Sequence, residues 1–371
     1  MYIYEHQQWP NFAWDPSKIS ILLAEVRHLQ GRLLGKMEAL GFNLREEATL
    51  KTLTQDVVKT SEIEGENLDV RQVRSSLARR LGINVKDLLP RDRHVEGIVE
   101  VMLDATREYD ASLTKKRLCT WHTALFPTGK SGMHRITAGH WRSKSSGVMQ
   151  VISGPYGHEK VHYEAPSYRR LSAEMKKFIK WVNTESEMDL VMRAALAHFW
   201  FVTLHPFEDG NGRMARAIAD MLLARSEKTH QRFYSMSSQI QSERNAYYAV
   251  LEKCQKSSLD ITLWMEWFLK CLKRAIGASE ETLEDVLQKA RFWKAHAGES
   301  FNERQLSLVN RLLDGFEGKL TSSKWAKLTK CSQDTALRDI NDLLGRKILM
   351  KDNAGGRSTH YQLLRTQSPN Q

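Results

Sequence analysis

The sequence predicts a mainly α-helical protein with one short β-hairpin and a C-terminal winged helix-turn-helix. Apolar residues recur at helical spacing along most of the 371 residues. Residues 147–163 break this pattern, because the β-prone runs Val148–Ile152 and Val161–Tyr163 flank a turn rich in glycine and proline. After Gly298 the expected order becomes helix, short turn, helix and two β-prone runs.

The N-terminal arm, up to about residue 16, is rich in aromatic residues and contains Pro10 and Pro16, so we expect it to be irregular and packed against the protein. Residues 127–139 also lack helical periodicity and contain three glycines. The predicted helices share a 3.6-residue apolar repeat. They cover 19–29, 45–62, 68–80, 91–109, 113–125, 167–183, 189–204, 213–225, 242–254, 260–276 and 302–315.

The C-terminal unit contains two further short helices, and we expect Ser322 or Ser323 to cap the first of them. The remaining predicted elements are a helix over 324–329, a turn over 330–332, a helix over 335–344, a strand over 348–350, a wing tip at 355–357, a strand over 361–364 and a disordered tail over 366–371.

Composition predicts a soluble globular protein, since 41% of residues are hydrophobic and 27% are charged. No apolar run approaches the roughly 20 residues that a membrane span needs. Four widely spaced cysteines without a CxxC pair argue against a disulfide framework and a zinc ribbon, so we expect a cytoplasmic protein. A net charge of +11 favours phosphate-bearing partners and leaves open a nucleotide, a nucleic acid or a ribosome.

Residues 204–216 combine features that turn a helix end into a binding loop. Pro206 disfavours helix at the residue before it, so the preceding helix is expected to end at His205. Phe207 is an apolar anchor for the loop. Gly210 and Gly212 permit positive φ angles and allow backbone N–H groups to turn inward.

The same segment has the residue types of a phosphate site. Asn211 is a good cap for the next helix, whose N-terminal N–H groups and dipole favour an anion. Arg213 and Arg216 lie on one face of its first turn, which indicates a di- or triphosphate. Asp209 offers the hard oxygen that Mg²⁺ prefers. His205, neutral near pH 7, is the expected general base.

The segment His205-Pro-Phe-Glu-Asp-Gly-Asn-Gly-Arg213-x-x-Arg216 matches the full signature HPFxDGNGRxxR, so the chain resembles the Fic (filamentation induced by cAMP) family over roughly residues 100–275. The resemblance implies a protein adenylyltransferase, a nucleotidyltransferase that uses ATP and Mg²⁺. It implies that His205 deprotonates a Ser, Thr or Tyr hydroxyl of a target protein, which attacks the α-phosphate of ATP.

The family also implies how the nucleotide and the target are held. Tyr247 and Tyr248 would pack near the base. The hairpin 147–163 would be a flap that aligns a target segment by strand pairing. The flap residues expected to dock the target are Val148, Val151, Ile152 and Val161. Asp209 would hold Mg²⁺ against the α- and β-phosphates of ATP. The backbone of Gly210 and Gly212 and the side chain of Asn211 would line the anion site, and Phe207 would anchor this loop. Arg213 would contact the β-phosphate and Arg216 the γ-phosphate.

An inhibitory motif of the family, (S/T)xxxE(G/N), is matched by Thr60, Glu64 and Gly65. Glu64 is expected to lie near a helix end and to form a bidentate pair with Arg216, which would occupy the guanidinium needed by the γ-phosphate.

This arrangement resembles the subclass with an N-terminal inhibitory helix, a Fic core and a C-terminal winged helix. We expect these domains at 1–95, 96–280 and 299–365. The opening Trp9–Trp14 resembles the N-terminal extension that some members carry.

Other interpretations stay open. The same site could remove AMP from a modified protein, with Glu64 positioning water. The chain could also modify itself or form a homodimer. Thr128-Gly-Lys-Ser131 is not a P-loop, because no strand precedes it and the first glycine is missing. His198 is expected to be a core histidine with a backbone partner.

The winged helix makes a DNA-binding regulator a further alternative. Residues 301–371 hold 12 Arg and Lys against seven Asp and Glu. The second short helix offers only Arg338, and Asp334, Asp339 and Asp342 lie beside it in sequence, so we expect it to suit a protein contact at least as well as the DNA major groove.

Overall fold

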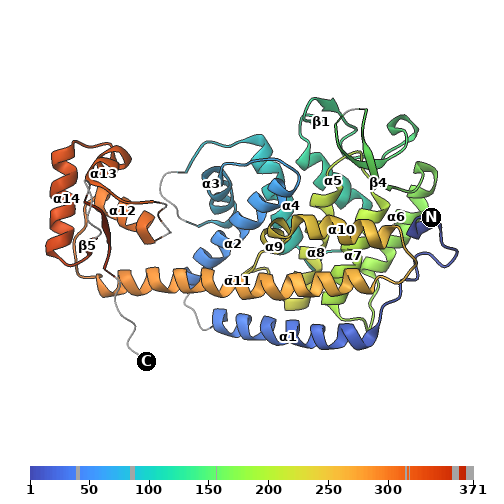
Figure 1. Cartoon of the computed structure of the whole chain (residues 1–371), viewed down its shortest axis with the longest axis horizontal. Helices are drawn as coiled ribbons and strands as arrows, with labels where there is room; N and C mark the ends of the chain where they lie inside the picture. Colours follow the sequence, from blue (N-terminus) through green and yellow to red (C-terminus); the bar gives the residue numbers. More distant parts are fainter. Residues whose placement is uncertain are drawn as a thin grey trace. The chain divides into compact units, whose positions relative to one another are not determined.

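The computed structural model describes residues 1–38, 42–83, 88–155, 157–313, 316, 318–352 and 359–364. The protein is mainly α-helical with short two-stranded sheets, which confirms the predicted fold class. It divides into unit 1, Met1–Glu280, and unit 2, Glu281–Gln371, and the boundary falls within helix α11 (Figure 1). The predicted wing tip at 355–357 and the tail at 366–371 lie outside the described residues.

Unit 1 is built of helices that begin and end within a few residues of most of the predicted ranges. They are α1 (Pro16–Glu38), α2 (Phe42–Ile63), α3 (Val70–Leu81), α4 (Arg93–Arg107), α5 (Lys115–Leu125), α6 (Tyr168–Asn183), α7 (Leu190–Leu204), α8 (Asn211–Glu227), α9 (Met236–Ser242), α10 (Arg244–Gln255) and α11 (Thr262–Ala295).

Three of these helices differ clearly from the prediction, and the first is α1, which runs to Glu38 rather than ending at residue 29. The short helix α9 was not expected, and it is capped by Ser235, whose hydroxyl accepts from the N–H of Ser238. Helix α11 runs to Ala295 rather than ending at residue 276, because no proline interrupts the later residues and Gly277 lies in the helix with open space around it.

Helices α7 and α8 form the centre of unit 1 and carry the predicted binding loop between them. Val191–Leu204 of α7 and Arg213–Ala224 of α8 are buried throughout. A helix that is apolar on all sides must be surrounded by other elements, and α7 meets this condition. The loop is therefore held at both ends by the best-packed part of the unit.

The N-terminal arm packs on unit 1, as predicted. It contains a short 3₁₀ helix, Ile3–Glu5, and Ile3 is fully buried. The Trp9 indole donates to Glu174 at 3.0 Å and its ring lies edge-on to Trp200, with centroids 6.2 Å apart. Helix α1 then lies beside α11, and ion pairs such as Glu25–Lys273 join the two (Figure 1).

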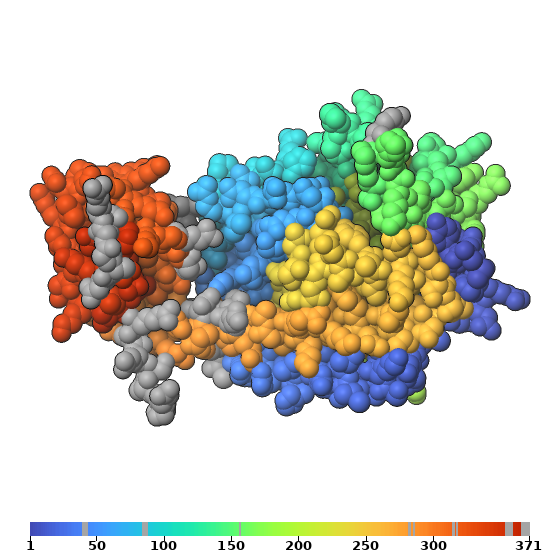
Figure 2. Space-filling model, in the orientation of Figure 1, coloured from blue at the N-terminus to red at the C-terminus, as the bar shows by residue number. Residues whose placement is uncertain are grey.

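Two antiparallel hairpins precede the central helices. Strands β1 (Lys130–Ser131) and β2 (His134–Arg135) occupy the segment whose helical pattern is broken. The predicted hairpin is present as β3 (Gln150–Ser153) and β4 (Lys160–Glu164). In the space-filling view this green hairpin projects at the surface beside the yellow residues of α10, which β4 contacts (Figure 2).

Unit 2 has the element order that the sequence predicts for a winged helix-turn-helix. Its elements after α11 are α12 (Glu303–Leu313), α13 (Ser322–Thr329), α14 (Gln333–Gly345), β5 (Leu349–Lys351) and β6 (Tyr361–Leu363). They surround the fully buried Trp325 and Ile340. The predicted cap is corrected by one residue: Thr321 caps α13, because it keeps a non-helical conformation and its hydroxyl accepts from Lys324 N–H at 3.2 Å.

Within the described residues, no helix is both long enough and apolar enough to span a membrane.

Candidate active site

His205 lies at the end of α7 in a left-handed conformation, with φ 48° and ψ 59°. This conformation directs the chain into the loop, and a buried arginine stabilises it. The Arg142 Nε donates to the His205 carbonyl at 2.7 Å, and the Arg142 backbone N–H donates to the Pro206 carbonyl at 2.8 Å. Arg142 therefore binds carbonyl groups that the end of α7 leaves without helical partners. No feature of the sequence pointed to Arg142.

The His205 ring is fixed in one tautomer. Its Nδ1 lies 3.2 Å from the Val202 carbonyl, which only accepts, so Nδ1 carries the proton and Nε2 keeps a free lone pair. Burial lowers the pKa of His205 to about 4, partly offset by the hydrogen bond to Val202. The imidazole is therefore neutral at pH 7 and able to accept a proton at Nε2.

Phe207 anchors the loop, as the sequence predicts. Its side chain is fully buried and stacks on the ring of His122 of α5, with centroids 4.0 Å apart and planes 4° apart. The Gly139 N–H donates to His122 Nδ1 at 2.9 Å, so His122 Nε2–H donates to the Asp209 carbonyl at 3.1 Å. His122 thus holds the loop at two points. Sequence reasoning missed it, because a single histidine within a helix carries no distinctive pattern.

The expected cap of α8 is corrected by the structure. Gly210, with φ 76°, is the residue before the helix, and Asn211 is the first helical residue. The Asn211 side chain instead binds back to Phe207, accepting from its N–H and donating to its carbonyl, both at 2.9 Å. These two bonds close the loop, so Asn211 braces the turn rather than capping the helix.

Gly212 also departs from the expectation. It has no positive φ and lies within α8, so backbone conformation does not require glycine there. A Cβ at this position would lie 2.2 Å from Glu64 Oε1. The Glu64 carboxylate therefore rests against the first turn of α8, the place where the helix N-terminus favours an anion.

Arg216 is enclosed by Thr60 of α2 and by Glu64 of the turn that follows α2. Its side chain is 2% exposed, and its Nη2 donates to Glu64 Oε1 at 2.7 Å. Nε donates to the Thr60 hydroxyl at 2.6 Å, and Nη2 also donates to the Thr60 carbonyl at 3.0 Å. The expected bidentate pair with Glu64 is therefore wrong in detail: only Nη2 donates to Glu64, Nε donates to Thr60, and Nη1 has no hydrogen-bond partner among the described residues. Burial opposes the charge on Arg216, but Glu64 together with Tyr247 and Tyr248 outweighs it, so the pKa of the guanidinium is raised.

Arg213 is paired in the same way by a residue that the sequence analysis did not assign. Its Nη1 donates to Glu66 Oε2 at 2.8 Å, and its guanidinium lies 5.0 Å from the centre of the Phe126 ring. Glu66 follows Gly65, whose φ of 83° turns the chain after α2 ends at Ile63. Both arginines of the loop are thus held by carboxylates from one turn. The cluster of acidic residues at 62, 64 and 66 was the sequence feature that could have indicated the pairing of Glu66 with Arg213.

Asp209 accepts hydrogen bonds from its neighbours in the loop and from a second hairpin. Its carboxylate accepts from the Gly210 N–H at 2.5 Å and from the Ser131 hydroxyl. Ser131 belongs to β1 and was missed, since its only sequence signal was the rejected P-loop resemblance. Among the described residues no cluster of three carboxylate, histidine or cysteine side chains forms a metal cage. A lone carboxylate suits Mg²⁺ that takes its other ligands from phosphates and water.

Tyr247 and Tyr248 take different positions. Tyr247 is 1% exposed and its hydroxyl is hydrogen-bonded to His198 at 2.9 Å, so it lies in the core. Tyr248 is 36% exposed and faces Arg244, whose guanidinium lies 5.2 Å from the ring centre. The expected backbone partner of His198 is thereby corrected to the Tyr247 hydroxyl.

The predicted flap residues lie on or beside the β3–β4 hairpin. Val151 and Ile152 are in β3, Val161 is in β4, and Val148 precedes β3. Ile152 is 54% exposed and Val148 is 68% exposed, although both are apolar. Among the described strands β3 pairs only with β4, which leaves the outer edge of β3 open.

The buried histidines predict a pH-dependent stability. Burial lowers the pKa of His198 from 6.5 to about 3. Because the unfolded chain binds this proton more readily, the stabilisation is complete above pH 6.5 and is lost as the pH falls below that value. Between pH 7 and pH 5 we expect His198 to contribute a loss of about 2 kcal/mol in the free energy of unfolding.

Urea unfolding at both pH values tests this. His198→Gln should lose less stability on acidification than the parent, by about the same 2 kcal/mol. His230→Gln, at an exposed loop position, is the matched control and should keep the parental pH dependence. Equal pH dependence in all three proteins would contradict the role of His198.

Two regions of the chain match known protein families. Residues 112–223 match the Fic/DOC family, and residues 2–83 match a domain of unknown function, DUF4172. The match over 112–223 contains the whole loop described above.

Curated relatives share the central part of the sequence. The chain is 28% identical over 225 residues to a protein adenylyltransferase Fic of Drosophila ananassae, which covers 57% of this chain and 41% of that protein. A protein of the same name from Culex quinquefasciatus is 28% identical over 246 residues, covering 62% of this chain and 45% of its own length. The chain thus spans less than half the length of these relatives.

Solved structures share the fold. A crystal structure of a Fic family protein from Desulfovibrio desulfuricans G20 covers 97% of this chain and 99% of its own, with a TM-score of 0.57 and 21% identity. A Fic-domain signalling protein from Bacteroides thetaiotaomicron covers 72% of this chain, with a TM-score of 0.50 and 18% identity.

Proposed function

We propose that this chain, whose residues 112–223 form a Fic/DOC-family domain, is a protein adenylyltransferase that transfers AMP from ATP to a hydroxyl of a target protein. One observation carries the proposal. The His205 Nε2 lone pair and the two arginines at the start of α8 are presented by one loop and the helix that follows it, between two buried helices. This combination supplies a base beside a triphosphate site.

The proposed reaction is an in-line displacement at the α-phosphorus. His205 Nε2 accepts the proton of a Ser, Thr or Tyr hydroxyl of the target. The hydroxyl oxygen forms a bond to the α-phosphorus, and the bond from this phosphorus to the bridging oxygen of the β-phosphate breaks. AMP remains on the target and pyrophosphate leaves. The neutral state of His205 at pH 7 supports its role as base.

The phosphates are proposed to occupy the first turn of α8. The N–H groups there and the guanidinium groups of Arg213 and Arg216 provide positive charge for the β- and γ-phosphates. Asp209 would bind Mg²⁺, which supplies further neutralisation of the phosphate charge. His122 and Asn211 contribute by fixing the loop, because both hydrogen-bond to its backbone.

We further propose that this site is restrained by the turn that follows α2. The carboxylates of Glu64 and Glu66 hold the two arginines that the β- and γ-phosphates need. The Glu64 carboxylate also lies where a phosphate oxygen would meet the N-terminus of α8, as its approach to Gly212 indicates. ATP binding in a productive pose therefore requires Glu64 to leave.

The target segment is proposed to add to the open edge of β3. Such pairing needs only backbone hydrogen bonds, and apolar side chains such as Ile152 and Val148 would contact the added strand. Backbone pairing alone does not select a target protein, so side-chain contacts determine which protein is bound.

Intact-mass spectrometry tests the function. The purified chain is mixed with ATP, Mg²⁺ and a bacterial lysate fraction, and we expect an increase in mass equal to one AMP on a protein of the mixture or on the chain itself. Loss of AMP from a modified protein would support the reverse reaction instead. Absence of either change with the Glu64→Gly variant would overturn the proposal.

A further inference from the structure

Three side chains of the β3–β4 hairpin and α10 form a hydrogen-bonded row that the proposed reaction does not use. Ser153 of β3 is exposed, and its hydroxyl oxygen lies 2.5 Å from Nε2 of His162 in β4. Nδ1 of the same ring lies 2.6 Å from Oε2 of Glu252 in α10. The row therefore joins both strands of the hairpin to the helix beside it.

The partners of His162 fix its tautomer. A carboxylate only accepts hydrogen bonds, so Nδ1 carries the proton and Nε2 accepts from the Ser153 hydroxyl. Lys256 donates to the other oxygen of Glu252 at 2.7 Å. The hydrogen bonds from Lys256 and His162 hold the pKa of Glu252 below its usual value, so its carboxylate is charged at pH 7. Serine, imidazole and carboxylate thus have the arrangement that activates a serine hydroxyl as a nucleophile.

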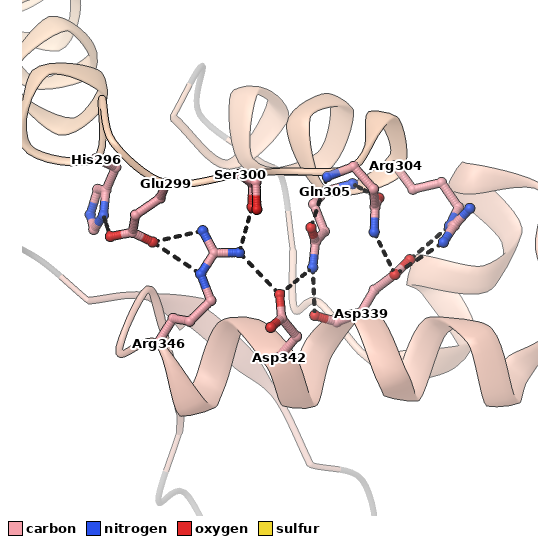
Figure 3. A network of polar contacts seen from close by, with 9 residues as sticks. His296, Glu299, Ser300, Arg304, Gln305, Asp339, Asp342 and Arg346 are labelled. Carbon is pink, nitrogen blue, oxygen red and sulfur yellow. Dashed lines mark hydrogen bonds and ion pairs between the residues drawn. The ribbon is translucent and has the colours of Figure 1, made fainter.

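A second imidazole–carboxylate pair in the chain lacks the serine. In unit 2, His296 Nδ1 donates to Glu299 at 2.6 Å, and Arg346 donates to the other oxygen of Glu299 (Figure 3). Among the described residues no hydroxyl group is hydrogen-bonded to Nε2 of His296. Such a pair can therefore serve structure alone, and the serine is what gives His162 a proton to accept.

We propose that Ser153 is a modification site, a serine that accepts AMP from ATP bound to a second copy of this chain; this inference rests on the proposed function. Ser153 belongs to β3, the strand whose open edge is proposed to receive target segments. A Ser153 that is itself the target is therefore presented by another copy. The same edge is open on that copy, and the exposed Ile152 beside Ser153 suits the pairing of one β3 with the other.

The step is a displacement at the α-phosphorus. His162 Nε2 takes the proton of Ser153, and the charge of Glu252 stabilises the imidazolium that forms. The Ser153 oxygen forms a bond to the α-phosphorus, and the bond from this phosphorus to the bridging oxygen of the β-phosphate breaks. Pyrophosphate leaves, AMP remains on Ser153, and the imidazolium releases its proton to water.

Peptide mapping by tandem mass spectrometry tests the site, after the full chain with Glu64→Gly has been incubated with ATP and Mg²⁺. AMP should be found on Ser153. His162→Gln should lower the rate of this labelling by about 100-fold or more, the contribution of a positioned base. His296→Gln, which alters the pair without a serine, is the matched control and should keep the rate. Ser172→Ala removes an exposed serine of α6 and should keep it as well.

The outcome separates this inference from the proposed function. AMP on a protein of a lysate without AMP on Ser153 would overturn the inference and leave the transferase standing. Equal labelling of Ser153 in His162→Gln and in its parent would overturn the role of His162.

Mixing two variants tests transfer between copies. The donor carries Glu64→Gly and Ser153→Ala, so its site is open and it has no hydroxyl at position 153. The acceptor keeps both residues, so its own site is restrained by Glu64. Adding the donor should raise AMP on Ser153 of the acceptor by about 10-fold or more. No increase would overturn transfer from a second copy.

A tagged fluorophosphonate tests the nucleophile without ATP. The Ser153 oxygen should form a bond to the phosphorus of this probe as fluoride leaves and His162 takes the proton. The adduct should form on Ser153 in the parent and be lost in His162→Gln, whether or not the chain transfers AMP. Absence of the adduct in the parent would overturn Ser153 as an activated serine.

Discussion

Replacement of His205 by alanine is expected to lower the rate of AMP transfer by about 100- to 10,000-fold, the usual contribution of a general base. The structure leaves Nε2 of His205 without a proton and fixes the ring through Nδ1. Alanine removes the acceptor and leaves the loop anchors at Phe207 and Asn211 in place. The loss should therefore appear in kcat, with little change in KM for ATP.

Transfer of label from α-³²P-ATP measures this effect, in a background that carries Glu64→Gly so that the parental rate is high. His230→Ala removes an exposed histidine in a loop after α8 and should keep the parental rate. A thermal shift with ATP should be the same for His205→Ala and its parent. Activity of the His205 variant within ten-fold of the parent would exclude His205 as the base.

Replacement of Glu64 by glycine is expected to raise AMP transfer by about 10- to 100-fold, the range of an ordinary coupling free energy between two ligands of one site. The variant removes the carboxylate from Nη2 of Arg216 and from the first turn of α8. Without ATP it should unfold more easily, by about 1–3 kcal/mol, because the buried Arg216 loses its carboxylate partner and keeps neutral partners such as Thr60. Excess ATP should restore the stability.

The same AMP-transfer assay separates the contribution of Glu64 to the inhibition from the contributions of Glu62 and Glu66. Glu62→Gly, two residues earlier, breaks only an ion pair with Lys59 and should leave transfer unchanged. Glu66→Ala should raise transfer less than Glu64→Gly, because the Glu66 side chain is 48% exposed and its pair with Arg213 is weaker. Equal rates for the parent and the Glu64 variant would remove the inhibitory role while leaving the transferase proposal standing.

Much of the fold follows from local sequence. The apolar repeat predicted most helices of unit 1, and β-prone runs around a glycine and proline turn predicted the β3–β4 hairpin. Periodicity reports which side of a segment is buried and so locates elements well. It located their ends less well, as Thr321 and the long α11 illustrate, since a cap or a continuing helix depends on a few residues with weak preferences.

The loop from His205 to Arg216 was recognisable from sequence alone, because its proline, glycines, acid and arginines must be consecutive to form the turn and the start of α8. Only the tertiary structure brought in His122, Arg142, Ser131 and Glu66, which come from distant segments and contact the loop through one or a few interactions each. It also decided that Asp339 is buried against Arg304 rather than facing outward. The order of residues along the chain determines which groups are neighbours within a turn. The packing of helices that are distant in sequence determines which charged side chains form ion pairs.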